Sequence, residues 1–360
     1  MGRTPTRVGV VGYGYWGSKH VRVLNSLPDV EVTVIDNDEQ RLREAMSSFP
    51  SVRIATDLAD ELDSQDAVVV ATPPGAHTSV GLLALNAGLH TLVEKPLANS
   101  IAEAEQLVEA ARKNDVRLMV GHTFEYNPAV WKLKKIISSG ELGRILYIDA
   151  ARLSLGRYQS DCNVIWDLAP HDISIVSYLL DEVPSAVQVW AQHNIGTEHA
   201  DVAYVKLEFE RSGAPAFVHL SWLHPEKTRR VTVVGEKKMA VYNDMSDNER
   251  IRIYDVGVDP KRMDEGASHG FPVSYRTGDI VSPFVPFQEP LMVQDSHFVE
   301  CVRTGNEPQT PGQRGLDVVK VLAATDAASA SGGPASVAIK DLASSGNGTG
   351  RLSGARGGSA

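Results

Sequence analysis

Three side chains could together remove a proton from an alcohol: Lys95, Asp167 and His171. Histidine titrates near neutral pH and suits the role of proton acceptor, while a lysine ammonium can stabilise developing alkoxide charge. Asp167 and His171 are four residues apart, so on a helix they would share a face and could reach one pocket. Asp167 could then orient the imidazole or bind a neighbouring hydroxyl. The structural alternative is that this pair only completes a hydrogen-bond network.

Alcohol oxidation needs a hydride acceptor, and the sequence from Gly12 to Gly17 indicates one. Gly12 permits a tight turn, Gly14 allows a pyrophosphate to approach the backbone, and Gly17 lets the following helix pack closely. A buried strand precedes this loop and a helix pattern follows, so phosphates would lie at the helix N-terminus. We therefore predict a dinucleotide site that also includes Tyr15 and Trp16. The alternative is a tight turn without a ligand.

The second predicted strand ends in Asp36, 19 residues after Gly17. A carboxylate here can accept hydrogen bonds from the adenosine ribose and would repel a 2′-phosphate. The next residues, Asn37 and Asp38, supply no arginine to attract that phosphate. The sequence therefore favours NAD over NADP, with Asn37 also placed at the cofactor.

Two more strand ends carry polar residues that we expect at the cofactor. The segment 71–77 follows a strongly apolar strand, and the segment 94–96 follows the next one. The carboxyl ends of parallel strands face the ligand crevice of an open sheet. The expected cofactor neighbours here are Thr72, Pro73, His77, Glu94 and Lys95.

Hydrophobic patterning divides the chain into two parts. Residues 7–121 alternate strands with amphipathic helices such as 99–114, which predicts a doubly wound parallel sheet. Later segments alternate with period two, which predicts antiparallel strands with one covered face. A helix is expected over 167–180, where Pro170 would fall in the tolerant first turn. The predicted fold is an α/β Rossmann domain plus an α+β domain with a large, mostly antiparallel open sheet. The predicted boundaries are a disordered lead over 1–6, domains over 7–124 and 125–335, and a Gly/Ser-rich disordered tail over 340–360.

Composition excludes several classes of function. The net charge is −10 across 360 residues, and no basic patch suggests nucleic-acid binding. No apolar run approaches the length of a membrane span. Cys162 and Cys301 are far apart and lack metal-ligand spacing, so we expect reduced thiols, a cytoplasmic protein and no metal.

Together, the glycine loop, the proline-rich loop at 71–77, Glu94-Lys95-Pro96 and the Asp167/His171 pair resemble the Gfo/Idh/MocA family of oxidoreductases. The resemblance covers roughly residues 7–335. It implies that Lys95, Asp167 and His171 are catalytic. The chain departs from the family pattern on the substrate side, with "CNVIWD" where many members have a Gly-Gly pair and Tyr126 where many have an arginine.

The segments 164–180 and 275–291 resemble members that act on nucleotide-linked sugars, such as those that oxidise the 3-hydroxyl of UDP-N-acetylglucosamine-type substrates. Arg152 and Arg157 could meet a diphosphate, and Tyr158 and Trp166 could stack on a base or sugar. Tyr126 is a further expected substrate neighbour. Arg152 could instead lie on a solvated face, and Trp166 in the core.

Three alternatives to an NAD-dependent nucleotide-sugar dehydrogenase remain open from the sequence. They are a keto-sugar reductase using NAD(P)H, a dehydrogenase of inositol or another free polyol, and a non-catalytic regulator that senses dinucleotides. Large apolar residues alternate along 203–210 and 216–223. This pattern, like the family resemblance, favours a homodimer or homotetramer formed through the second sheet.

Overall fold

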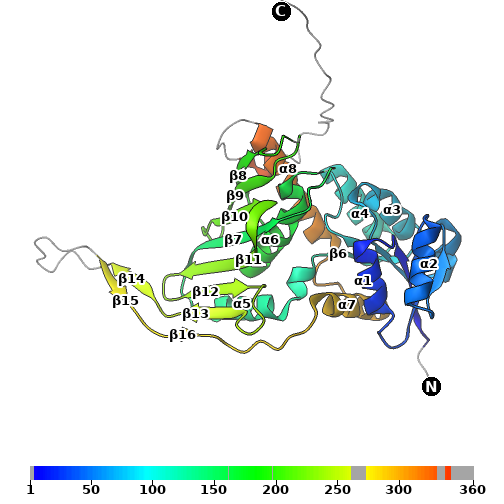
Figure 1. Cartoon of the computed structure of the whole chain (residues 1–360), viewed down its shortest axis with the longest axis horizontal. Coiled ribbons are helices and arrows are strands. Elements are labelled where there is room, and N and C mark those ends of the chain that lie inside the picture. The colour runs from blue at the N-terminus through cyan, green and yellow to red at the C-terminus, as the bar shows by residue number, and fades with distance from the viewer. Residues whose placement is uncertain (1–3, 161, 197, 261–272, 331–336, 342–360) are drawn as a thin grey trace, which may run out of the picture.

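The computed structural model describes residues 4–160, 162–196, 198–260, 273–330 and 337–341. Two β-sheets lie side by side, each with its own helices (Figure 1). The predicted lead over 1–6 is too long, because Thr6 is buried and already belongs to β1. Residues 1–3 of that lead and residues 342–360 of the predicted tail lie outside the described residues.

The first sheet has six parallel strands in the order β3-β2-β1-β4-β5-β6. Helices cover both faces, which is why its central strands are apolar at nearly every position. The strands are β1 (Thr6–Val11), β2 (Val30–Ile35), β3 (Arg53–Ala55), β4 (Ala67–Val70), β5 (His90–Glu94) and β6 (Leu118–Gly121). The helices are α1 (Tyr15–Leu24), α2 (Glu39–Ser48), α3 (His77–Asn86) and α4 (Ile101–Lys113), with 3₁₀ turns η1 (Ala59–Ser64) and η2 (Pro74–Ala76). The predicted Rossmann architecture is confirmed.

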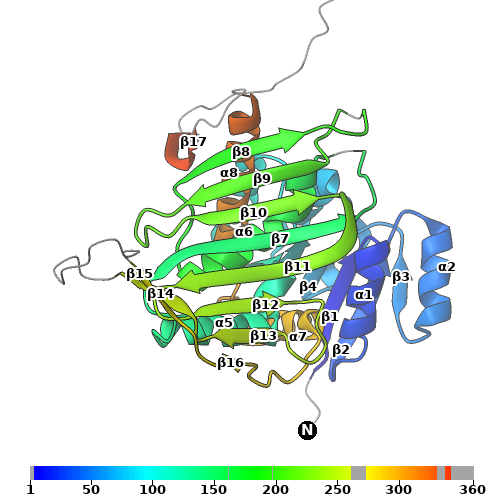
Figure 2. The same cartoon turned by 60° about the vertical axis from the view of Figure 1, so that its left-hand side comes forward.

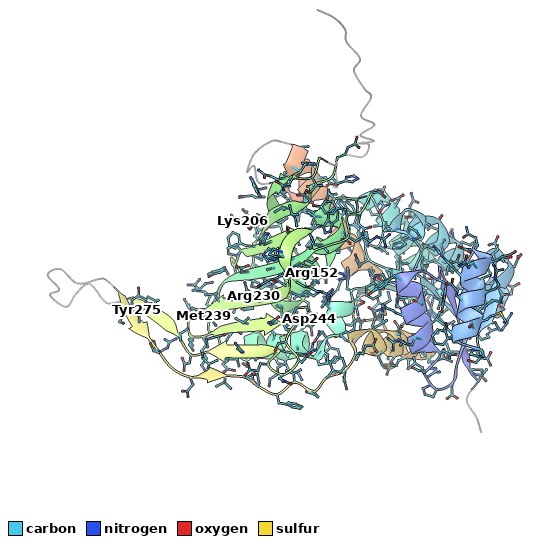
Figure 3. All side chains as sticks on the ribbon, in the orientation of Figure 1. Arg152, Lys206, Arg230, Met239, Asp244 and Tyr275 are labelled. Carbon is cyan, nitrogen blue, oxygen red and sulfur yellow. The ribbon has the colours of Figure 1, made fainter. Side chains whose placement is uncertain are left out.

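The second sheet has nine strands in the order β16-β13-β12-β11-β7-β10-β9-β8-β17. Only β7 and β10 pair in parallel among its described strands, so the predicted mostly antiparallel sheet is also confirmed. Its strands are β7 (Ile145–Leu155), β8 (Ala186–Gln192), β9 (Val202–Glu208), β10 (Ala216–Ser221), β11 (Leu223–Gly235), β12 (Met239–Asn243), β13 (Ile251–Tyr254), β16 (Ile280–Val281) and β17 (Val337–Ala338). A separate hairpin, β14 (Gly257–Pro260) and β15 (Val273–Arg276), forms an arm that carries Tyr275 away from the sheet (Figure 3).

Helices cover one face of the second sheet and leave the other face open (Figure 2). The covering helices are α5 (Pro128–Ser138), α6 (Val164–Leu180) and α8 (Gly312–Ala330). Their apolar residues share one core with the inward-facing residues of the strands. The alternation read from the sequence therefore reflects a sheet with one buried face.

The last helices connect the two halves of the molecule. Helix α7 (Pro290–Thr304) packs against α1, and α8 contacts both α4 and α6. Short 3₁₀ turns, η3 (Thr123–Tyr126) and η4 (Ile339–Asp341), complete the described elements. Helix α7 thus packs against the Rossmann half, and α8 packs against both halves.

Helix α6 begins earlier than the sequence suggests. The side chain of Asn163 accepts hydrogen bonds from the amides of Ile165 and Trp166, so the helix starts at Val164. The expectation that Pro170 lies in the first turn is therefore wrong. Proline cannot donate to the carbonyl of Trp166, so this turn of the helix lacks one hydrogen bond.

Candidate active site

The glycine loop has the geometry needed to receive a phosphate. Gly12 has φ +94°, and a Cβ there would lie 2.9 Å from the carbonyl oxygen of Ala71. A Cβ on Gly17 would lie 1.7 Å from the carbonyl oxygen of Gly12, whereas one on Gly14 would meet nothing within 4 Å. Gly14 is also the N-cap of α1 and provides no side-chain cap. The loop is therefore tight inside, open at Gly14, and edged by free helix amides.

Asp36 is buried at the end of β2 and faces this loop. Its Oδ2 accepts a hydrogen bond from the amide of Tyr13 at 2.6 Å, and its Oδ1 accepts one from the amide of Asp38 at 2.9 Å. Arg41 of α2 brings its Nη1 to 3.5 Å from Asp36 Oδ2. Sequence reasoning noted that Asn37 and Asp38 provide no arginine, but it missed Arg41, which enters from the next helix. Asn37 itself is exposed.

His77 joins two loops at the sheet edge. Its Nδ1 lies 2.8 Å from the carbonyl oxygen of Pro96, and its Nε2 lies 3.0 Å from the carbonyl oxygen of Thr72. Burial lowers the pKa of this imidazole. Thr72 and His77 line the pocket described next, whereas Pro73 is exposed and does not line it.

A pocket of about 330 Å³ opens between the two halves of the chain. The Rossmann half contributes mainly loops that follow strands, and the second half contributes the start of α6 and the loop before it. Tyr15 is largely exposed beside Trp16 and does not line the pocket. The residues lining it are Trp16, Ala71, Thr72, Pro74, Gly75, His77, Glu94, Lys95, Pro96, Asn99, Gln159, Cys162, Trp166 and Asp167.

Lys95 and Asp167 meet across this pocket. Lys95 Nζ donates to the carbonyl oxygen of Asp167 at 2.9 Å and lies 3.5 Å from its Oδ1. Asp167 Oδ2 accepts from the indole nitrogen of Trp222, a buried residue of the second half, at 3.0 Å. Sequence reasoning missed Trp222, because nothing in the local sequence links it to α6. Asp167 therefore fixes the ammonium of Lys95, and Trp222 fixes the carboxylate of Asp167.

His171 lies one turn beyond Asp167 on α6. Its ring packs edge-on against Phe124 with centroids 4.9 Å apart, and its Nδ1 finds no hydrogen-bond partner among the described residues. Burial, together with the charges of Arg152 and Lys95, lowers the pKa of His171 well below 6.5. The imidazole is thus neutral at pH 7 and able to accept a proton.

His122 is a second buried imidazole that sequence reasoning missed. It follows β6, so its place at the carboxyl edge of the sheet was the available signal. Neither ring nitrogen has a hydrogen-bond partner in the described part of the chain. Burial, with the nearby charges of Arg314 and Lys95, lowers its pKa to about 4.

The low pKa of His122 predicts a loss of stability in mild acid. Between pH 6.5 and about 4, His122 is protonated in the unfolded chain but stays neutral in the folded chain. The free energy of unfolding therefore falls as pH falls. The shift corresponds to at most about 3 kcal/mol. Urea unfolding at pH 7.5 and pH 4.5 should show a smaller difference for His122→Phe than for wild type. An unchanged difference would mean that His122 does not set this slope.

Two arginines expected at a substrate have different environments. Arg152 is buried and makes a two-pronged ion pair with Asp172 of α6, at 2.7 Å and 3.1 Å. Its guanidinium also lies over the ring of Phe124. The expectation that Arg152 meets a diphosphate is therefore corrected, because its donors face a buried carboxylate. Arg157 is exposed on the loop after β7.

The three aromatic residues expected beside a substrate lie in different places: Tyr126 in the core, Trp166 at the pocket and Tyr158 against Trp222. Tyr126 is buried in the first half's core, and its hydroxyl lies 3.2 Å from Thr310 Oγ1, so the placement of Tyr126 at a substrate is corrected. Trp166 lines the pocket, and its indole nitrogen donates to Asp326. Tyr158 packs against Trp222, and its hydroxyl donates to Asp201.

Two further arginines, Arg229 and Arg250, form a cluster near His171 that the sequence analysis did not predict. Arg229 of β11 pairs in register with Arg152, so both project from the same face of the sheet. Arg229 lies 3.4 Å from Asp244, and Arg250 lies 3.5 Å from the same carboxylate. Two cations, Arg229 and Arg250, therefore share the carboxylate of Asp244 near His171. Arg229 is among the charges that lower the pKa of His171.

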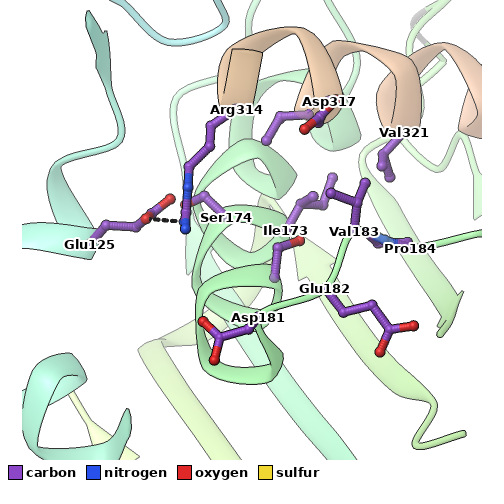
Figure 4. A pocket seen from close by; sticks show the side chains of 12 residues that line it. Glu125, Ile173, Ser174, Asp181, Glu182, Val183, Pro184, Arg314, Asp317 and Val321 are labelled. Carbon is purple, nitrogen blue, oxygen red and sulfur yellow. Dashed lines mark hydrogen bonds and ion pairs between the residues drawn. The ribbon is translucent and has the colours of Figure 1, made fainter. Parts of the chain in front are cut away.

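A separate pocket of about 210 Å³ lies between α6 and α8 (Figure 4). Glu125 and Arg314 meet there as an ion pair (Figure 4). Burial raises the pKa of Glu125 to about 8 despite the neighbouring guanidinium. Lys95 and Asp167 line the first pocket and do not line this one, whereas His171 lines neither.

Comparison with known proteins places both halves of the chain in one family. Residues 6–122 match the model described as an oxidoreductase family with an NAD-binding Rossmann fold, and residues 130–241 match the GFO/IDH/MocA C-terminal domain.

Among the described residues, none of the helices is long and apolar enough to cross a membrane.

Similar proteins include several named enzymes. The chain is 25% identical over 329 residues to D-apiose dehydrogenase of Paraburkholderia graminis, covering 88% of this chain and 85% of that protein. It is 28% identical over 257 residues to UDP-N-acetylglucosamine 3-dehydrogenase of Acidithiobacillus ferrooxidans, covering 70% and 77% respectively. The crystal structure of GenD2 from gentamicin A biosynthesis, in complex with NAD, superposes with a TM-score of 0.77 at 25% identity, covering 93% and 97% of the two chains. The chain belongs to the Gfo/Idh/MocA family of NAD-binding oxidoreductases and is a dehydrogenase of that family.

Proposed function

We propose that this dehydrogenase transfers hydride between a secondary hydroxyl of a nucleotide-linked sugar and NAD, giving a keto-sugar. The meeting of Lys95 and Asp167 across the pocket carries the proposal, because it places an ammonium and a carboxylate from the two halves beside the nucleotide loop. His171, one helical turn away, supplies a neutral imidazole. NAD supplies the hydride acceptor when it is bound.

The glycine loop fits the pyrophosphate of NAD. The open position at Gly14 and the uncapped N-terminus of α1 are what a phosphate needs, while Gly12 and Gly17 leave no room for side chains. Asp36 faces the same loop and suits the adenosine ribose. We place Trp16, Thr72, His77 and the other pocket-lining residues of the first half around the rest of the cofactor.

Each of the three site residues has a separate role in this proposal. His171 accepts the proton from the substrate hydroxyl, since its pKa is held below the usual value and its Nδ1 has no partner among the described residues. Lys95 donates a hydrogen bond to the oxygen that loses that proton and stabilises its developing negative charge. Asp167 fixes the ammonium of Lys95 through its carbonyl and carboxylate oxygens. In the reverse direction the same groups return the proton to a keto-sugar.

The arginine cluster favours an anionic substrate over a free polyol. Within the part of the chain that the structure describes, Arg229 and Arg250 have only the carboxylate of Asp244 as an ion-pair partner, so one positive charge is left over beside α6. Arg229 is also partly exposed. A sugar diphosphate is the substrate chemistry that such guanidinium groups recognise. Arg157, exposed on the neighbouring loop, is placed at the same diphosphate.

The experiment measures reduction of NAD at 340 nm with UDP-, dTDP- and GDP-sugars, with myo-inositol, D-apiose and glucose as controls. Turnover of one nucleotide sugar alone supports the proposal. Turnover of only a free sugar or polyol would contradict the nucleotide handle. No turnover would move the assignment to a keto-sugar reductase, tested with NADH, or to a regulator that binds NAD without chemistry.

Replacing Arg229 tests the diphosphate contact directly. Arg229→Gln is expected to raise KM for the nucleotide sugar by about 10-fold or more, the loss of a charge-assisted contact of about 1.5–3 kcal/mol. The affinity for NADH, measured by fluorescence, should change little. Arg230→Gln is the matched control, because residue 230 points to the opposite face of β11. Equal effects of the two substitutions would rule out a specific contact by Arg229.

We also propose that the open face of the second sheet pairs with another copy of this chain. Trp190, Tyr204 and Phe217 are about half exposed there, and the ring of Tyr204 stacks on His219 with centroids 4.1 Å apart. Contiguous exposed aromatic residues are typical of subunit contacts. A solution mass of one chain would contradict this proposal.

A further inference from the structure

A buried charged cluster lies directly behind Lys95. It joins three elements: His20 of α1, Glu94 of β5 and Asp295 of α7. His20 Nε2 lies 3.0 Å from Glu94 Oε1, and His20 Nδ1 lies 2.9 Å from Asp295 Oδ2. The side chains of His20 and Asp295 are completely buried, and that of Glu94 is 6% exposed. We infer that His20 and Asp295 are positioning residues for Lys95, an inference that rests on the role proposed for this lysine.

The distances fit an imidazole that acts as a charged bridge. Each ring nitrogen faces a carboxylate oxygen, and a doubly protonated imidazole donates to both carboxylates at once. Burial by itself would lower the pKa of His20, but the charges and hydrogen bonds of Asp295 and Glu94 outweigh it and raise the pKa to about 10. The same imidazolium lowers the pKa of Glu94 despite burial. The cluster thus carries one net negative charge.

Glu94 transmits this arrangement to the next residue. Its Oε2 accepts a hydrogen bond from the amide of Lys95 at 3.2 Å. The neighbouring strand leaves room for the carboxylate only because residue 121 is glycine: a Cβ there would lie 2.8 Å from Glu94 Oε1. The carboxylate is therefore fixed by His20 on one oxygen and fixes the backbone of Lys95 with the other.

The fixed backbone sets where the ammonium of Lys95 can reach. Its Nζ spans the pocket to Asp167, so the side chain is held at both ends. The cluster continues through Gln294, which donates to Asp295 at 3.3 Å and accepts from Thr123 Oγ1 at 2.8 Å. Helix α7 thereby contributes, through Asp295 and His20, to the position of Glu94 at the end of β5. The net negative charge behind Lys95 also attracts its ammonium group.

The test uses His20→Gln and Asp295→Asn, with Val299→Ala as the control. Val299 is buried in the same core as Val21 and Leu24 of α1, so its truncation loosens this packing without touching the charged cluster. The first readout is the rate of reductive methylation of Lys95, measured by peptide mass spectrometry relative to Lys134. We expect both cluster variants to raise this rate several-fold and Val299→Ala to leave it unchanged. An unchanged rate in the cluster variants, or an equal rise in Val299→Ala, would overturn the inference.

A second measurement uses the wild-type protein and so does not depend on the folding of any variant. In the ¹⁵N-histidine NMR spectrum of the wild-type protein at pH 8, we expect one doubly protonated imidazolium, assigned to His20. Its absence would overturn the charged bridge.

Turnover provides a third readout, where a substrate is in hand. The cluster variants should lower kcat by about 10- to 100-fold, as misplacement of a reacting group does, with little change in KM for NAD. Methylation and NMR do not depend on the substrate. If no nucleotide sugar in the panel is turned over, the result counts against the proposed function. The positioning inference is then decided by the methylation rate of Lys95 and the NMR signal of His20.

Discussion

His171→Ala is expected to remove most turnover while leaving NAD binding nearly intact. General-base catalysis contributes about 10²- to 10⁴-fold, so kcat should fall by that factor. NADH affinity should persist because His171 lies on α6, in the second half of the chain, and not in the glycine loop. The measurement pairs the 340 nm rate with an NADH fluorescence titration.

His90→Ala is the matched control for this substitution. His90 begins β5, at the end of the strand opposite to Lys95, and its Nδ1 accepts a hydrogen bond from the amide of Arg117. Its loss should leave kcat within about 2-fold of wild type, as for a residue without contact to the chemistry. Undiminished turnover in His171→Ala would show that the base is another group, with His122 the next candidate.

The pH profile gives an independent check of the same assignment. A general base works only when deprotonated, so activity falls as pH drops through its pKa. Because burial and nearby cations lower the pKa of His171, the acid limb of the kcat/KM profile should lie below pH 6.5. An acid limb above 6.5 would contradict a base in this environment.

Arg152→Met is expected to destabilise the second half of the chain severely. The substitution leaves the carboxylate of Asp172 buried without its cation, which costs about 3–5 kcal/mol in free energy of unfolding. Both side chains are more than nine-tenths buried, so water cannot replace the guanidinium. Urea unfolding monitored by tryptophan fluorescence measures the loss. An arginine that contacts a diphosphate, as proposed for Arg229, would instead change KM for the substrate with little effect on stability.

Two comparisons isolate the cause of that loss. The double variant Arg152→Met/Asp172→Leu removes both charges, and we expect it to recover most of the stability. Arg144→Met breaks an exposed ion pair with Glu236 just before β7, and should cost at most about 1 kcal/mol. If the double variant is as unstable as Arg152→Met alone, the cost comes from lost packing against Phe124 and not from the unpaired carboxylate.

The sequence by itself determined the features that depend on neighbours along the chain. The glycine spacing after an apolar strand predicted the Rossmann turn, and alternating patterns predicted both sheets, because steric and hydrophobic rules act over a few residues. The same holds for Lys95 at a strand end and for Asp167 and His171 on one helix face. These short-range relations predicted that Lys95 follows a strand of the first sheet and that Asp167 and His171 share one helix.

Only the tertiary structure decided which charged groups meet. Arg152 looked available for a diphosphate, yet Asp172 occupies it, while Arg229 approaches α6 from a strand far along the chain. Tyr126 is carried into the core by η3 and held there by Thr310. His20 and Asp295 lie on helices at opposite ends of the sequence and meet only because α7 returns to α1. A pattern within one segment carries no record of such a partner, since burial and pairing depend on elements that fold against it from elsewhere.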